Sequence, residues 1–201
     1  MRIKAIFFGL FILLQSSLLW SQSVKSVYTN VEKSCRKLKK DEIKGLTYEE
    51  GMIYQECPGL GGYKIILADH SLLTIISPTG KEKLLSVGIG KCLPYIAGEK
   101  IKIEWRMRQI QKGLFVPYAM IVRMAADQCR NGISQTISYL VVVKMSELTE
   151  PCIIANVSPS PKQNELAREI ADNATIQRCI TETEPINYDM WCHNEGEPCG
   201  D

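Results

Sequence analysis

This sequence has few histidines, no cysteine pair spaced as in zinc sites and no long apolar run after its N-terminal segment. With two histidines in 201 residues, the chain has too few imidazoles for a His-rich metal site. Its eight cysteines include no C-x2-C or C-x4-C pair, the spacing typical of zinc sites. After residue 20, no segment holds the roughly 20 apolar residues that a spanning helix requires. We therefore expect no metal, no cofactor and no transmembrane span in the mature chain.

Recognisable catalytic motifs are also missing. Residues 59–62 (Gly-Leu-Gly-Gly) lack the Lys-Ser/Thr ending of a phosphate-binding loop and precede a predicted strand, so we interpret them as a tight turn. Residues 69–71 (Asp-His-Ser) are adjacent and cannot converge as a catalytic triad. A hydrolase that uses carboxylates from distant segments stays open as an alternative, because sequence spacing does not reveal such pairs.

Residues 1–23 have the features of a signal peptide. The first four residues include two basic side chains, and an unbroken apolar run follows over residues 5–14. Ser21 and Ser23 satisfy the small-x-small rule, which predicts cleavage after Ser23. An uncleaved anchor is disfavoured because the apolar run is short and then interrupted. We expect export to the periplasm or to the medium.

Charge divides the exported chain into two parts. The formal charge of +2 comes from the two basic residues of the predicted signal peptide, which leaves 22 residues of each sign. Residues 181–201 hold six acidic residues and neither Lys nor Arg, so residues 24–180 carry +6. The sequence therefore predicts a single β-rich domain over 24–180 and an acidic, cysteine-containing tail over 181–201.

All eight cysteines follow the predicted cleavage site. An even number in an exported chain indicates disulfides, because oxidising compartments allow them to persist. Eight cysteines allow 105 pairings, so the connectivity stays open, and nearest-neighbour pairing is the working hypothesis. It joins Cys35 to Cys57, Cys92 to Cys129, Cys152 to Cys179 and Cys192 to Cys199.

Alternation of apolar and polar residues predicts a chain rich in strands. The clearest strand covers 101–108, where Ile, Ile, Trp and Met alternate with Lys, Glu, Arg and Arg. Residues 24–50 are polar and charged and carry no strand prediction. Other strands are predicted over 52–57, 63–68, 72–77, 83–89, 118–124, 134–144 and 152–157.

One helix is predicted over residues 161–176. Ser160 and Gln163 match a capping box, and the expected buried stripe contains Leu166, Ile170 and Ala174, joined by Ala167 and Ala171. Strands followed by one helix predict an α+β fold. We expect a mainly antiparallel sheet, barrel or sandwich-like, with the helix packed on it and disulfides stabilising it.

Several short segments carry a family resemblance. They are Cys-Pro-Gly at 57–59, Gly-Gly-Tyr at 61–63, Ile-Glu-Trp-Arg at 103–106, and Pro-Tyr-Ala at 117–119 with Arg123. This pattern resembles small exported, periplasmic bacterial proteins that have no assigned activity. In those proteins a cysteine precedes the Cys-Pro-Gly segment, as Cys35 does here, and a late pair brackets a helix, as Cys152 and Cys179 do. The resemblance covers residues 27–180 and implies fold and export but no mechanism.

Two charged groups are candidate binding surfaces. Glu104, Arg106 and Arg108 share the polar face of one predicted strand, and Arg123 lies on its expected partner. They form either a ligand surface or, as we favour, a solvated face with weak ion pairs. A basic cluster could attract an anionic partner, although nucleic acid is not expected for an exported chain without stacking aromatics. This basic cluster consists of Lys33, Arg36, Lys37, Lys39, Lys40 and Lys44.

These observations favour a non-enzymatic exported protein. We expect a binding or envelope-associated domain whose partner is a protein or an envelope component. An inhibitor of a secreted or host hydrolase is the alternative, with the acidic tail as its contact surface. A hydrolase with dispersed carboxylates is the second alternative.

Overall fold

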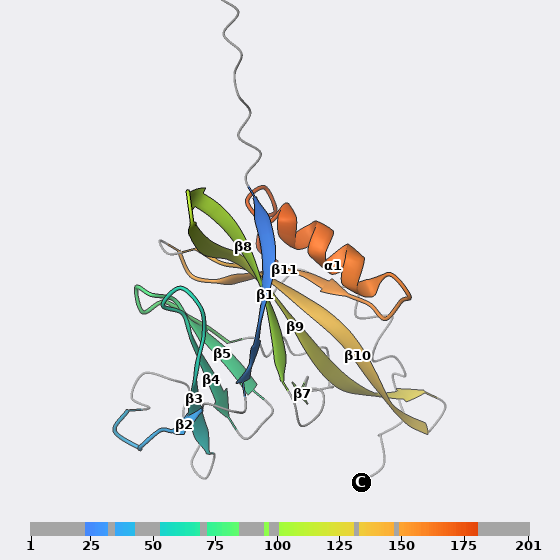
Figure 1. Ribbon diagram of the computed structural model, residues 1–201. Coiled ribbons are helices and arrows are strands. Elements are labelled where there is room, and N and C mark those ends of the chain that lie inside the picture. The colour runs from blue at the N-terminus through green and yellow to red at the C-terminus, as the bar shows by residue number, and fades with distance from the viewer. Residues whose placement is uncertain are drawn as a thin grey trace, which may run out of the picture.

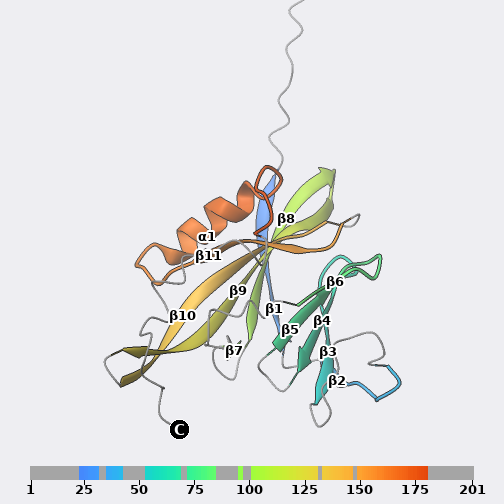
Figure 2. The same ribbon diagram turned by 180° about the vertical axis from the view of Figure 1, so that it is seen from behind.

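Two antiparallel sheets and one helix form three layers in the computed structural model (Figure 1). The structure describes residues 23–31, 35–42, 53–68, 72–84, 95–96, 101–130, 133–146 and 149–180. The smaller sheet and the helix lie on opposite sides of the larger sheet (Figure 2). The sheets do not close into a barrel, so the predicted α+β, mainly antiparallel fold is confirmed in its open form.

The larger sheet has the strand order β1-β8-β9-β10-β11, with β7 beside β9. The long hairpin of β8 and β9 turns tightly at Lys112 and Gly113, and Gly113 takes a φ of +80° that favours glycine. The strands are β1 (Val24–Asn30), β7 (Tyr95–Ile96), β8 (Lys102–Gln111), β9 (Leu114–Arg130), β10 (Ile133–Lys144) and β11 (Cys152–Val157).

The smaller sheet has the order β2-β3-β4-β5-β6. Residues 59–62 connect β3 to β4, and Gly61 and Gly62 have φ values of +61° and +82°. The predicted tight turn is thus confirmed. The connection at 69–71 lies outside the described residues. The strands are β2 (Arg36–Lys37), β3 (Tyr54–Pro58), β4 (Lys64–Ala68), β5 (Leu72–Ile76) and β6 (Glu82–Leu84).

The main core lies between the two sheets. Ile103, Trp105 and Met107 of β8 pack there against β4 and β5, so the predicted alternation of this strand is confirmed. Trp105 is fully buried, and its indole Nε1 donates a hydrogen bond to Thr29 Oγ1 at 2.8 Å. The indole's polar atom is therefore satisfied inside an apolar layer.

Strand β1 was not predicted from the sequence. It pairs with β8 along its whole length, and Val27 packs against the main core. Most of its residues are polar, and Lys25, Ser26 and Thr29 contact Phe115, Glu104 and Trp105 on distant strands. The edge strand therefore depends on long-range pairing that a local pattern does not reveal.

Helix α1 (Gln163–Asp172) is shorter than predicted, and turns flank it on both sides. No side chain caps its N-terminus, so the predicted capping box of Ser160 and Gln163 is wrong. Gln163 instead faces the sheet, where its amide nitrogen donates to the Val157 carbonyl at 2.8 Å. The buried stripe is Gln163, Ala167, Ala171 and Ala174, whereas Leu166 is 45 % exposed.

Two disulfides confirm two of the four hypothesised pairs. Cys35–Cys57 ties the start of the smaller sheet to β3, and Cys152–Cys179 ties β11 to the segment after α1. The segment 1–22, the tail 181–201 and Cys92 lie outside the described residues, and of Cys129 in β9 only the backbone is described, so the other two pairs stay predictions. Of the helices that the structure describes, none combines the length and apolar character needed to cross a bilayer.

Candidate functional site

The polar face predicted for β8 lies against α1 instead of facing open solvent. Glu104 is only 9 % exposed, and both Glu104 and Arg106 bond to side chains of the helix. Arg123 from β9 also reaches the helix. Arg108 stands apart, with its guanidinium 5.5 Å from the centre of the Tyr118 ring. The structure thus joins three of the four predicted residues in one interface.

Glu104 is held by a two-pronged ion pair with Arg168 of α1. Arg168 Nε donates to Oε1 at 2.8 Å and Nη2 donates to Oε2 at 3.1 Å. Ser26 on β1 donates its hydroxyl to the same carboxylate and accepts a bond from Arg106. The carboxylate therefore links three elements of the fold, and its geometry is the strong bidentate kind.

Asp172, one helical turn beyond Arg168, makes the reciprocal pair with Arg106. Arg106 Nη2 donates to both Asp172 oxygens at 2.7 Å, and the Tyr118 hydroxyl donates to Oδ1 at 2.6 Å. Tyr118 reaches this position because it is the extra residue of a β-bulge, between the partners of Arg106 and Met107. Two opposite ion pairs therefore fix the rotation of α1 on the sheet.

Proton affinities in this network follow from burial and from the paired charges. Burial raises the pKa of Glu104, but the hydrogen bonds from Arg168 and Ser26 outweigh it, and the net pKa is lowered. Burial, followed by the bond to Asp172, raises the pKa of Tyr118 to about 12. The Glu104 bond raises the pKa of Arg168. At neutral pH Glu104 and Arg168 are therefore charged and Tyr118 is neutral, which preserves the contacts that hold the helix on the sheet.

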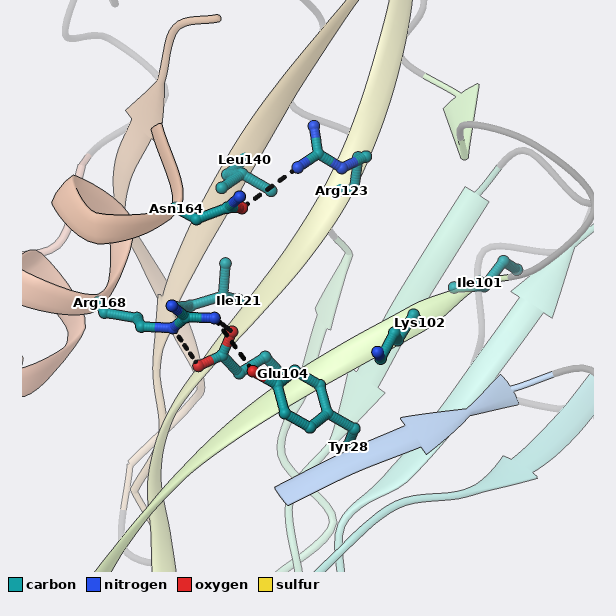
Figure 3. Close-up of a pocket in the computed structure, with 9 residues that line it drawn as sticks. All are labelled: Tyr28, Ile101, Lys102, Glu104, Ile121, Arg123, Leu140, Asn164 and Arg168. Atoms are coloured by element: carbon teal, nitrogen blue, oxygen red, sulfur yellow. Dashed lines mark hydrogen bonds and ion pairs between the residues drawn. The ribbon is translucent and has the colours of Figure 1, made fainter. Parts of the chain in front are cut away.

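A pocket of about 360 Å³ opens between α1 and the larger sheet (Figure 3). This volume lies within the range of small-molecule sites. Ile121 and Leu140, both buried, supply apolar surface, while charged side chains from the sheet and helix point into the space. The lining residues are Tyr28, Ile101, Lys102, Glu104, Ile121, Arg123, Leu140, Asn164 and Arg168.

Arg123 differs from the other two arginines at the helix interface. Its Nη1 donates to Ser138 Oγ at 2.9 Å and to Gln163 Oε1 at 3.2 Å. Its Nη2 donates to Asn164 Oδ1 at 3.3 Å (Figure 3). All three acceptors are neutral, whereas Arg106 and Arg168 each bind a carboxylate. Within the part of the chain that the structure describes, the charge of Arg123 has no acidic partner.

The lining offers few groups for acid–base chemistry. The lining includes a single carboxylate, Glu104, whose lowered pKa and two donors make it a poor proton donor or base. No group of three or more potential metal ligands occurs among the described residues. The pocket does hold polar side chains fixed by neighbours on rigid elements, as a binding site requires.

Arg36 and Lys37 of the basic cluster form β2 of the smaller sheet, away from α1 (Figure 1). Arg36 pairs with Glu42 at 2.7 Å and with Glu56 at 3.2 Å, and the Arg36 side chain is about half exposed. Acidic neighbours thus offset part of the cluster's charge. Lys33 and Lys44 lie outside the described residues.

Sequence reasoning missed four polar residues that line the pocket. Tyr28 lies on β1, which was not predicted, and Lys102 was placed on the polar face of its strand but not among the candidate residues. Asn164 and Arg168 lie outside the buried stripe that was predicted for the helix. The spacing of Arg168 and Asp172, four residues apart, places them on one helix face. That face could be recognised as a docking face only once the opposite charges of β8 were known to lie beneath it.

The chain matches no protein-family model, no curated protein and no solved structure. The resemblance to exported bacterial proteins therefore stays a prediction, and the site is interpreted from its own geometry.

Proposed function

We propose that this protein is an exported, non-enzymatic binding domain that takes up its ligand between α1 and the larger sheet. The observation that carries the proposal is the pocket itself, with charged side chains held in place over an apolar floor. The Glu104 carboxylate already accepts hydrogen bonds from Arg168 and Ser26, so it is poorly placed to transfer protons, which favours ligand recognition over catalysis. The two disulfides support export, because such bonds persist in oxidising compartments.

A pocket-blocking variant tests the binding site. Asn164 is exposed and lines the pocket, so Asn164→Trp places a large ring at its mouth. Leu166→Trp adds a ring of the same size at a position of the helix that does not line the pocket. We expect small molecules extracted from the cell envelope or medium to shift the NMR signals of the pocket in wild type and Leu166→Trp, but not in Asn164→Trp.

Two outcomes of that experiment would contradict the proposal. One is that the ligand shifts the same NMR signals in Asn164→Trp as in wild type, or shifts only signals of residues outside the pocket. The other is chemical conversion of the bound compound, which mass spectrometry of the released molecule detects. Recovery of an unaltered compound is the expected result.

The export of this protein is tested on the mature chain recovered from cell fractions. The protein recovered from cells of its source is expected to begin at Val24, to lie outside the cytoplasm and to resist alkylation at its cysteines. N-terminal sequencing and thiol labelling of the fractions measure this. A full-length cytoplasmic chain with reduced cysteines would contradict it.

A further inference from the structure

The pocket carries an excess of positive charge. Lys102, Arg123 and Arg168 line it against one carboxylate, Glu104, which is already bound to Arg168. Lys102 places its ammonium 4.4 Å from the centre of the Tyr28 ring. Among the described residues, neither Lys102 nor Arg123 forms an ion pair. The two unmatched cations therefore share one partly enclosed space.

Arg123 is the stronger of these two features. It is half-buried, and three neutral oxygens fix the direction of its guanidinium. An ionised guanidinium gains more from an anion than from neutral acceptors, and its fork matches the oxygens of carboxylate and phosphate. A half-buried, oriented arginine without an acidic partner is therefore prepared to receive an oxyanion.

Apolar surface beside these cations limits the kind of anion. Ile121 and Leu140 are buried side chains that line the pocket, and the half-exposed Tyr28 ring stands at its edge. Such surface favours a ligand whose body is partly apolar. A free inorganic ion would leave this apolar surface in contact with water.

We propose that the pocket binds a small organic oxyanion, with its carboxylate or phosphate on Arg123 and Lys102 and its apolar body over Ile121 and Leu140. The inference rests on the proposed function and adds the chemical class of the ligand. Carboxylate and phosphate share the chemistry that this site recognises, and the experiment separates them.

Four probes and calorimetry test the proposal on the full chain, expressed for export and purified in oxidised form. Phenyl phosphate and benzoate carry an anion on an aromatic ring, benzyl alcohol is a neutral analogue, and inorganic phosphate lacks the apolar body. We expect the two aromatic anions to bind at least about tenfold more tightly than benzyl alcohol. Inorganic phosphate should bind more weakly than phenyl phosphate, and a preference for phenyl phosphate or for benzoate identifies the head group.

Matched variants assign the binding to this site. Arg123→Gln is expected to weaken the aromatic anions about tenfold, because a charge-assisted bond is lost. Arg36→Gln removes the same charge from the basic cluster on the other sheet and should leave affinity within about twofold of wild type. Lys102→Gln changes an exposed residue and is expected to weaken binding about threefold, which keeps the test valid if Arg123→Gln unfolds.

Three results would overturn the inference. The first is an affinity for benzyl alcohol equal to that for benzoate. The second is loss of binding in Arg36→Gln but not in Arg123→Gln. The third is a wild-type protein that binds none of the probes. If benzyl alcohol binds and Asn164→Trp blocks it while Arg123→Gln does not, the binding pocket stands and only the ligand class fails. If Asn164→Trp has no effect on any ligand, the proposed function itself fails.

Discussion

At the scale of single residues, the arginines at the helix interface differ in the charge of their partners. Glu104 forms an ion pair with Arg168, and Arg106 forms one with Asp172. Arg123, on the adjacent strand, keeps an unmatched charge among the described residues. The sequence predicted that Glu104, Arg106 and Arg123 belong together, because period two fixes the face of each strand. It could not predict their different roles, because Arg168 and Asp172, which pair with Glu104 and Arg106, come from the helix.

The pairing of Glu104 makes stability depend on pH. Its pKa is lowered in the folded protein, so the stabilisation is present above the unfolded value of about 4.3 and is lost as pH falls through the lower folded pKa. Glu104→Gln is expected to reduce the free energy of unfolding by about 2 kcal/mol at pH 7 and by much less in acid. Urea titrations at both pH values measure the difference.

Glu165→Gln is the matched control for that substitution. Glu165 is an exposed residue of the same helix, so its substitution should change the free energy of unfolding by less than about 0.5 kcal/mol. An equal loss for Glu104→Gln at both pH values would show that the paired charge is not its cause.

At the scale of elements, alternation predicted strands well where both faces of the strand have distinct surroundings. Strand β8 is the clearest case, with Trp105 towards the other sheet and Glu104 towards α1. Strand β1 and the short β2 and β7 depend on their partners, and no local pattern marked them. The helix was found, but its rotation was wrong at Leu166, because the ion pairs and the alanine stripe, rather than residue size, decide which face is buried.

The alanine stripe sets how closely α1 approaches the sheet. Ala171 has no exposed surface and packs against apolar residues of the sheet, so Ala171→Leu forces the helix outward. We expect a loss of about 1–3 kcal/mol in the free energy of unfolding, measured by urea denaturation. Leu166→Ala, at an exposed position of the same helix, should change it by well under 1 kcal/mol; equal effects would contradict the observed rotation.

The turn from β3 to β4 is a second element that tolerates little change. A Cβ on Gly59 would lie 2.4 Å from the Tyr63 carbonyl oxygen, so Gly59→Ala requires a backbone shift. Gly80 has a φ of +80° but open space around it. Thermal unfolding should show a larger decrease in Tm for Gly59→Ala than for Gly80→Ala, whose strain is worth about 1 kcal/mol. The reverse order would contradict the tight packing of this turn.

At the scale of the whole molecule, the disulfides secure two different layers. Cys35–Cys57 belongs to the smaller sheet, and Cys152–Cys179 ties the segment after α1 to the edge of the larger sheet. The fold class and these two pairs could be predicted from the sequence, because alternation marks strands and nearest-neighbour pairing limits the choices. The pocket was not, because its lining comes from four strands or their flanks and one helix.

Removing the second disulfide should loosen the helix layer selectively. We expect Cys152→Ser with Cys179→Ser to lower the free energy of unfolding by about 2–4 kcal/mol and to speed hydrogen exchange in α1. The matched pair Cys35→Ser with Cys57→Ser should leave exchange in α1 slow. Faster exchange in α1 in both variants would show that the layers do not respond separately.

A crystal structure of the oxidised protein with phenyl phosphate is the most direct test of the proposed binding site. We expect electron density for the phosphate against the guanidinium of Arg123 and for the ring over Ile121 and Leu140. Density against the basic cluster at Arg36 and Lys37, with the pocket beneath α1 holding only water, would contradict it.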